Sequence, residues 1–246
     1  MPSNYRNLLV QDLERLEGYT FFEVPAAKSL EVLGLSYFSS VDLVEWLDPR
    51  VRYILEYRSL RELPVSGAYR PSEIKGHQLT EQAGFSYGAE DMMMMNLGIF
   101  LGQLEKQSQF LLELNLDLID RNGNEKNEKV LGQKEQGLIQ VGLAPFDLKI
   151  LPSREGLGDF VNSVFRLSMI FHEGRHTDGE DYLHVTCPAG HDFAGRDACD
   201  NTRDGAYMVS AVVIREFVAN CEDCSAREKE ALRLLYLDSL NRVISD

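Results

Sequence analysis

The segment from residue 159 to residue 176 constrains the fold more than any other part of this 246-residue chain. It reads DFVNSVFRLSMIFHEGRH, and its apolar residues recur at the spacing of one helix face, a stripe that continues into His172. Asp159 is a residue type suited to cap the start of such a helix. The sequence therefore predicts a helix with an inward-facing stripe and two histidines, His172 and His176, near its end.

These two histidines belong to the pattern HExxH, formed by residues 172 to 176. On a helix, positions i and i+4 lie one turn apart on the same face, so both imidazoles can reach one Zn²⁺ ion at about 2.0 to 2.1 Å. Glu173 lies beside that face, where it can accept a proton from water without becoming a ligand. The plainer alternative is a pair of surface histidines on either side of a solvated glutamate. The pattern predicts His172 and His176 as zinc ligands and Glu173 as a general base.

With this motif the chain resembles the zincin metallopeptidases, over about residues 110 to 220. The resemblance implies an α+β fold in which a twisted, mostly antiparallel sheet is followed by the active-site helix and a helical C-terminal part. It also implies zinc-dependent hydrolysis of a peptide or protein substrate. One feature departs from the family: the longer zincin pattern disfavours charge around the motif, whereas Arg175 and Asp178 stand here.

A catalytic zinc ion needs a third protein ligand. The sequence TRDGAY at residues 202 to 207 is similar to part of the aspzincin pattern, which implies Asp204 as the third ligand and Tyr207 as a catalytic residue that assists the transition state. The match is partial, because the leading glycine is missing and Asp204 lies 28 positions after His176. Arg203 is an alternative to Tyr207 for stabilising the oxyanion. Four further residues are alternatives for the ligand: Asp200, Glu216, His184 and His191.

The remaining elements follow from periodicity and capping signals. We expect helices at 6–17, 40–47, 203–219 and 225–243, the last starting with a Ser225/Glu228 capping box, and strands at 51–57, 112–119, 138–143 and 146–151. Residues 64–90 are expected to form an irregular connection, 92–101 to fill the core, and 122–136 to be a solvated excursion. The chain is predicted to comprise an N-terminal mixed α/β portion of unknown role, 1–90, and a zincin-like portion, 91–246, or one continuous domain.

All four cysteines lie in the last quarter of the chain. We expect two disulfides, Cys187 with Cys199 and Cys221 with Cys224, while a structural zinc site with His184 and His191 is the alternative. The even count favours export to the periplasm or the extracellular space. Because charged residues come early in the chain, no secretory leader is expected in this sequence.

Charge narrows the classes of partner. The formal net charge is −14 and the sequence pI is about 4.8, which disfavours binding to nucleic acid. No apolar run reaches the roughly 20 residues that a membrane span needs. Two rival functions remain open at this point. One is a non-catalytic exported interaction or cell-envelope protein with a structural or vestigial metal site, and the other is a metal-dependent hydrolase that acts on an amide of cell-wall material.

Overall fold

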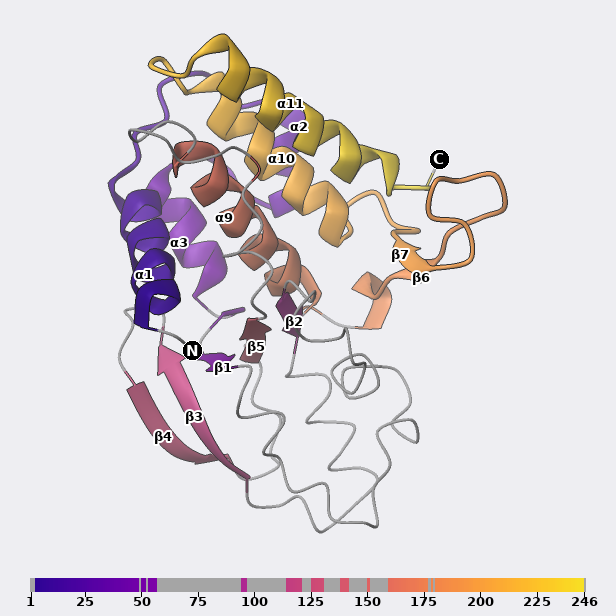
Figure 1. The fold of residues 1–246 in the computed structure, drawn as a ribbon. Helices are drawn as coiled ribbons and strands as arrows, with labels where there is room; N and C mark the ends of the chain where they lie inside the picture. Colours follow the sequence, from indigo (N-terminus) through magenta and orange to yellow (C-terminus); the bar gives the residue numbers. More distant parts are fainter. Residues whose placement is uncertain are drawn as a thin grey trace. The chain divides into compact units, whose positions relative to one another are not determined.

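The computed structural model describes residues 3–48, 50–51, 53–56, 94–96, 114–120, 125–130, 138–141, 150, 159–176, 178 and 180–245 (Figure 1). The chain divides into two compact units. The first unit comprises residues 1–13 and 48–148, and the second comprises residues 14–47 and 149–246. Residues 14–47 thus group with the C-terminal part of the chain, which differs from the expected division near residue 90.

The first unit contains a five-stranded sheet. Its strands are β1 (Tyr53–Glu56), β2 (Met94–Asn96), β3 (Leu114–Asp120), β4 (Glu125–Val130) and β5 (Leu138–Val141). Their order is β2-β5-β1-β3-β4, and only the β1–β5 pair is parallel. Together with the helices of the second unit, this makes the described part of the chain α+β. Helix α1 (Ser3–Gly18) begins in the first unit, and its residues from 14 onward belong to the second.

The second unit is mainly helical. Its helices are α2 (Ala27–Leu33), α3 (Ser40–Leu47), α9 (Asp159–His176), the short 3₁₀ helix η3 (Glu180–Tyr182), α10 (Ala206–Ala219) and α11 (Ala226–Asn241). A two-stranded antiparallel ribbon, β6 (Val185–Thr186) with β7 (Asp197–Cys199), lies between η3 and α10 in sequence. Helix α10 packs against α2, α9 and α11, and Figure 1 shows it between α9 and α11.

Helix α9 is the most deeply buried helix of this unit. Its residues from Val161 to Leu167 are buried on every side, as are Phe171 and both histidines. The ring of Phe171 stacks on Trp46 of α3 with a centroid distance of 5.3 Å. A helix surrounded in this way has little freedom to shift, so α9 is a rigid support for the side chains of its last turn.

Most of the expected elements are present. The helices expected at 6–17, 40–47, 159–176 and 225–243 and the strands expected at 51–57, 112–119 and 138–143 correspond to α1, α3, α9, α11, β1, β3 and β5. Both hydrogen bonds of the Ser225/Glu228 capping box are formed. The strand expected at 146–151 and the irregular connection at 64–90 lie outside the described residues, apart from Ile150.

Two expectations need correction. The polar segment 122–136, expected as a solvated excursion, contains strand β4, because its residues Glu125 to Val130 pair in register with β3. The helix expected from residue 203 begins at Ala206, with Gly205 as its N-cap. Arg203 and Asp204 therefore precede the helix instead of lying in its first turn.

Candidate metal centre

Three imidazoles from two separate segments meet in the second unit. His172 and His176 come from the last two turns of α9, and His184 comes from the residue just before β6. One ring nitrogen of each lies within 4.8 Å of the corresponding nitrogen of the other two. The Nε2 atoms of His172 and His184 are 3.0 Å apart. Two imidazole nitrogens bound to the same tetrahedral Zn²⁺ lie about 3.3 Å apart, so the three rings are close enough together to hold one metal ion.

The second nitrogen of each ring is held by a protein group, and these contacts locate the protons. Nδ1 of His176 donates to the Tyr182 carbonyl at 2.6 Å, and Nδ1 of His184 donates to Oδ1 of Asp200 at 2.9 Å. Neither oxygen carries a proton of its own to donate. A neutral imidazole that donates through Nδ1 has its lone pair on Nε2, as a metal ligand requires.

His172 is oriented in the same way. Its Nδ1 lies 3.3 Å from the hydroxyl oxygen of Ser210, and that hydroxyl donates its proton to the Ser168 carbonyl at 3.2 Å. When the hydroxyl proton is directed at Ser168, the hydroxyl oxygen is an acceptor for the Nδ1 proton of His172. Burial lowers the pKa of His172 well below its usual value, and the neighbouring His176, His184 and Arg242 lower it further. Nε2 of His172 and Nε2 of His184 face each other across 3.0 Å.

Asp200 connects the third imidazole to helix α10. Its side chain is 2% exposed, and while Oδ1 accepts from His184, Oδ2 accepts the backbone N–H of Tyr207 at 2.6 Å. The Asp200 backbone is itself held by the C-terminal tail, because its N–H donates to the Arg242 carbonyl and its carbonyl accepts from Ile244. Asp200 thus fixes the orientation of His184 relative to the first turn of α10.

Tyr207 lies against the imidazoles. Its ring stacks on His184 and meets His172 edge to face, with a centroid distance of 4.6 Å in both cases. Arg242 donates to the Tyr207 hydroxyl oxygen at 2.8 Å. Burial raises the pKa of this phenol to about 12, an effect that Arg242 opposes and that the carboxylates of Asp200 and Glu173 reinforce. The hydroxyl thus keeps its proton at neutral pH and, because its oxygen already accepts from Arg242, can donate it.

Arg175, which departs from the zincin pattern, has a clear structural role. It is buried, its guanidinium lies over the rings of Trp46 and Tyr182, and it donates to the Val32 carbonyl of α2. It also pairs with Asp178 at 2.8 Å. Because Tyr182 supplies the carbonyl that orients His176, Arg175 supports the second imidazole indirectly.

The group of three imidazoles contains His184 where the sequence had favoured Asp204. The physical reason is the path of residues 180–200, which return as a ribbon beside α9. The carboxylate of Asp204 instead accepts a hydrogen bond from the Tyr182 hydroxyl at 3.3 Å. The predicted Cys187–Cys199 pairing indicates that His184 and Asp200, which flank the two cysteines, lie near each other, but it does not indicate that His184 faces α9.

The other candidates from the sequence have different partners. Glu216 accepts from the Ser29 hydroxyl and the Ala26 N–H at the start of α2. His191 donates to the Asn241 carbonyl through Nε2 and accepts from the Phe193 N–H through Nδ1. The side chains of Glu216 and His191 are therefore engaged in hydrogen bonds to other parts of the fold.

The disulfides Cys187–Cys199 and Cys221–Cys224 are both formed, as the sequence predicted. Cys187, Cys199 and His191 also lie close enough to hold a metal ion, but the disulfide removes both thiolates from that group. Two disulfides are consistent with an oxidising compartment. Among the described residues, every helix is too short or too polar to cross a bilayer.

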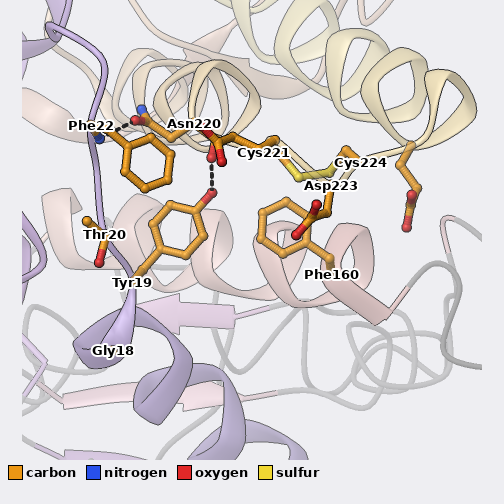
Figure 2. Close-up of a pocket in the computed structure, with 11 residues that line it drawn as sticks. Gly18, Tyr19, Thr20, Phe22, Phe160, Asn220, Cys221, Asp223 and Cys224 are labelled. Carbon is orange, nitrogen blue, oxygen red and sulfur yellow. Dashed lines mark hydrogen bonds between the residues drawn. A yellow bond between two sulfur atoms is a disulfide. The ribbon is translucent and has the colours of Figure 1, made fainter.

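A separate pocket lies at the other end of α10 (Figure 2). Its volume is about 360 Å³, and it is bordered by Tyr19, Phe22 and Phe160 and by the Cys221–Cys224 disulfide. Asn220 closes one side, where its carbonyl accepts from the Tyr19 hydroxyl and its side chain accepts from the Phe22 N–H. The 14 residues of α10 separate this pocket from the imidazoles, a length of about 20 Å.

Comparisons with protein-family models, with curated proteins and with solved structures give no match for this chain.

Proposed function

We propose that this protein is a zinc-dependent metallopeptidase whose metal ligands are His172, His176 and His184. The observation that carries the proposal is the convergence of three imidazoles whose Nδ1 atoms are all engaged with protein oxygens. The Nε2 atoms of His172 and His184 face each other at 3.0 Å, close to the separation of about 3.3 Å between two imidazole nitrogens bound to one tetrahedral Zn²⁺. Three protein ligands are also the number typical of catalytic zinc, which keeps a position for water or substrate.

Zinc held by these residues would supply Lewis acidity and lower the pKa of its water towards 7. Glu173 follows His172 directly on α9 and is 6% exposed, so its carboxylate lies close to the ligands in a place shielded from bulk solvent. In the proposed reaction Glu173 accepts the proton of the attacking water and passes it to the leaving amine. Its charge reaches Tyr207, whose pKa it helps to raise, so the carboxylate acts on the ring that contacts both His172 and His184.

Tyr207 is proposed to stabilise the oxyanion that forms on the scissile carbonyl. A phenol with a pKa of about 12 is protonated at neutral pH, and its oxygen already accepts a hydrogen bond from Arg242. The remaining hydroxyl proton can therefore be donated to a developing negative charge. Arg242 polarises the phenol and holds it in place, so Arg203 is not needed for this role.

Export and a zincin-like fold are part of the same proposal. Two disulfides support an oxidising compartment, and the α+β composition together with the HExxH helix supports the zincin-like fold. The ligand set differs from that of the aspzincins, because His184 replaces the aspartate as third ligand.

Metal analysis and a cleavage assay test the proposal together. Protein purified without added metal should contain about one equivalent of zinc by mass spectrometry, and His172→Ala should lose it. Glu173→Gln should keep the zinc and lower turnover of a peptide library by about 10²–10⁴-fold. Glu45→Gln, at an exposed position of α3, is the matched control and should leave both properties unchanged.

Two results would favour the rival functions. Stoichiometric zinc without cleavage of any peptide or cell-wall amide would favour an interaction protein with a structural metal. Cleavage that is confined to cell-wall amides would support a metal-dependent hydrolase but show that its substrate is cell-wall material and not peptide.

A further inference from the structure

The ribbon that carries His184 is closed by a disulfide. His184 directly precedes β6, Cys187 directly follows it, and Val185 of β6 pairs with Cys199 of β7. The next residue after β7 is Asp200, which orients the His184 ring. The Cys187–Cys199 bond therefore ties the strand that bears the third imidazole to the strand that bears its carboxylate partner.

Apart from the disulfide, the ribbon is held by short-range hydrogen bonds: the Thr186 hydroxyl donates to Oδ1 of Asp197, the Cys187 N–H to the Arg196 carbonyl and the Gly195 N–H to the Cys187 carbonyl. The strands have two and three residues, their pairing is interrupted by an irregularity after Val185, and an isolated ribbon of this size is at best marginally stable in water. The second strand has its own anchor, because Asp200 hydrogen-bonds to Arg242 and Ile244 of the tail. The segment that bears His184 is held before it by the Tyr182 carbonyl, which accepts from His176, and after it by the disulfide.

We propose that formation of the Cys187–Cys199 disulfide completes the metal site, so that the chain binds its metal ion tightly only after oxidation. This inference rests on the proposed function in so far as His184 is a metal ligand. The step is a thiol–disulfide exchange with a disulfide oxidant: the two cysteine thiols form one S–S bond, the oxidant is reduced to two thiols, and the two protons pass to the oxidant's sulfurs.

The reduced pair would also compete for metal. Sγ of Cys199 lies 3.8 Å from Nε2 and 3.9 Å from Nδ1 of His191, and thiolates are strong zinc ligands. Oxidation removes these competing sulfurs in the same step that holds His184 in place. Metal is thereby directed to the three imidazoles in an oxidising compartment and not in a reducing one.

The second disulfide provides a matched control. Cys221 and Cys224 are also bonded to each other, but they border the pocket at the far end of α10 (Figure 2). Cys221→Ser/Cys224→Ser removes the same kind of bond without touching the ribbon. Cys187→Ser/Cys199→Ser removes the ribbon disulfide and leaves no thiolates there to bind metal.

The experiment measures the zinc dissociation constant of each variant by competition with a chromogenic chelator, with folding checked by circular dichroism. We expect Cys187→Ser/Cys199→Ser to bind zinc roughly 10–100-fold more weakly than the oxidised wild type, the range of a lost orienting partner, and the control pair to match the wild type. Should the serine variant fail to fold, a phosphine reductant followed by alkylation of the freed thiols in the Cys221→Ser/Cys224→Ser protein makes the same comparison, since only the ribbon disulfide is then reducible and no thiolate is left to bind metal.

A double-mutant cycle separates loss of His184 from general loosening. In a His184→Ala background, removal of the ribbon disulfide should change zinc affinity no further. Equal affinities with and without the disulfide, or a full additional loss in the His184→Ala background, would overturn the inference. Absence of zinc from the oxidised wild type would instead overturn the proposed function itself, so the two failures are distinct.

Discussion

A buried carboxylate, Asp200, is hydrogen-bonded to the partly exposed ring of His184, with Oδ1 of the carboxylate 2.9 Å from Nδ1 of the ring. The other carboxylate oxygen accepts from the Tyr207 N–H, so one side chain orients a proposed ligand and binds the first turn of α10. A carboxylate can accept on both sides, whereas an amide accepts on one side and donates on the other.

Asp200→Asn is therefore expected to weaken zinc binding by about 10–100-fold and to cost about 1–3 kcal/mol of unfolding free energy, because one of its two partners must face an amide N–H. Chelator competition and urea unfolding measure the two effects. Asp181→Asn, at an exposed residue of η3, should change neither quantity. Unchanged zinc affinity in the Asp200→Asn variant would show that the orientation of the His184 ring does not matter for binding.

The identity of the third ligand can be tested directly. His184→Ala should weaken zinc binding by about 100-fold or more, whereas Asp204→Asn should keep it within about threefold of the wild type, because only the histidine faces the other two imidazoles. Cobalt substitution supplies a second readout, since the visible spectrum of Co²⁺ changes with the ligand set. The opposite ranking of the two variants would restore Asp204 as the ligand.

Gly205 leaves space for Asp200. A Cβ added at Gly205 would lie 2.6 Å from Cγ and 2.8 Å from Cβ of Asp200, and closer still to Oδ2, although the glycine's φ of −65° suits any residue. Gly205→Ala should therefore displace the carboxylate, destabilise the fold by about 1–3 kcal/mol and weaken zinc binding. Gly18→Ala is the matched control, since its added Cβ meets nothing within 4 Å. Similar unfolding curves for the two variants would contradict this account.

Local patterns made much of the second unit predictable. The stripe of α9, the Ser225/Glu228 capping box and the two disulfide pairings follow from spacing in the sequence, and the structure confirms each of them. These features depend on contacts between residues that are close in sequence. The HExxH motif belongs to the same class, because its two histidines lie one helical turn apart.

The position of His184, the third member of the imidazole group, could not be predicted from such local patterns. His184 reaches α9 through a ribbon whose second strand is anchored to the tail at Arg242 and Ile244, some forty residues later. Asp204 was favoured because residues 202–207 are similar to part of the aspzincin pattern. Helix α10 starts at Ala206, so that carboxylate lies in the preceding turn, beside the Tyr182 hydroxyl. Long-range closure of this kind leaves little trace in local periodicity.

The phenol of Tyr207 gives stability a specific dependence on alkaline pH. Its pKa is about 12 in the folded protein and about 10 in the unfolded chain. Between these values the folded state keeps a proton that the unfolded state has lost, so stability falls as the pH rises through this window and is unaffected below it. The wild type should therefore lose about 1 kcal/mol more unfolding free energy than Tyr207→Phe between pH 9 and pH 11, as measured by urea unfolding at each pH.

Tyr19, whose pKa is also raised to about 12 by burial, is present in both proteins, so its contribution cancels in the comparison. Parallel losses in the two proteins would mean that the Tyr207 hydroxyl is not buried as the structure has it.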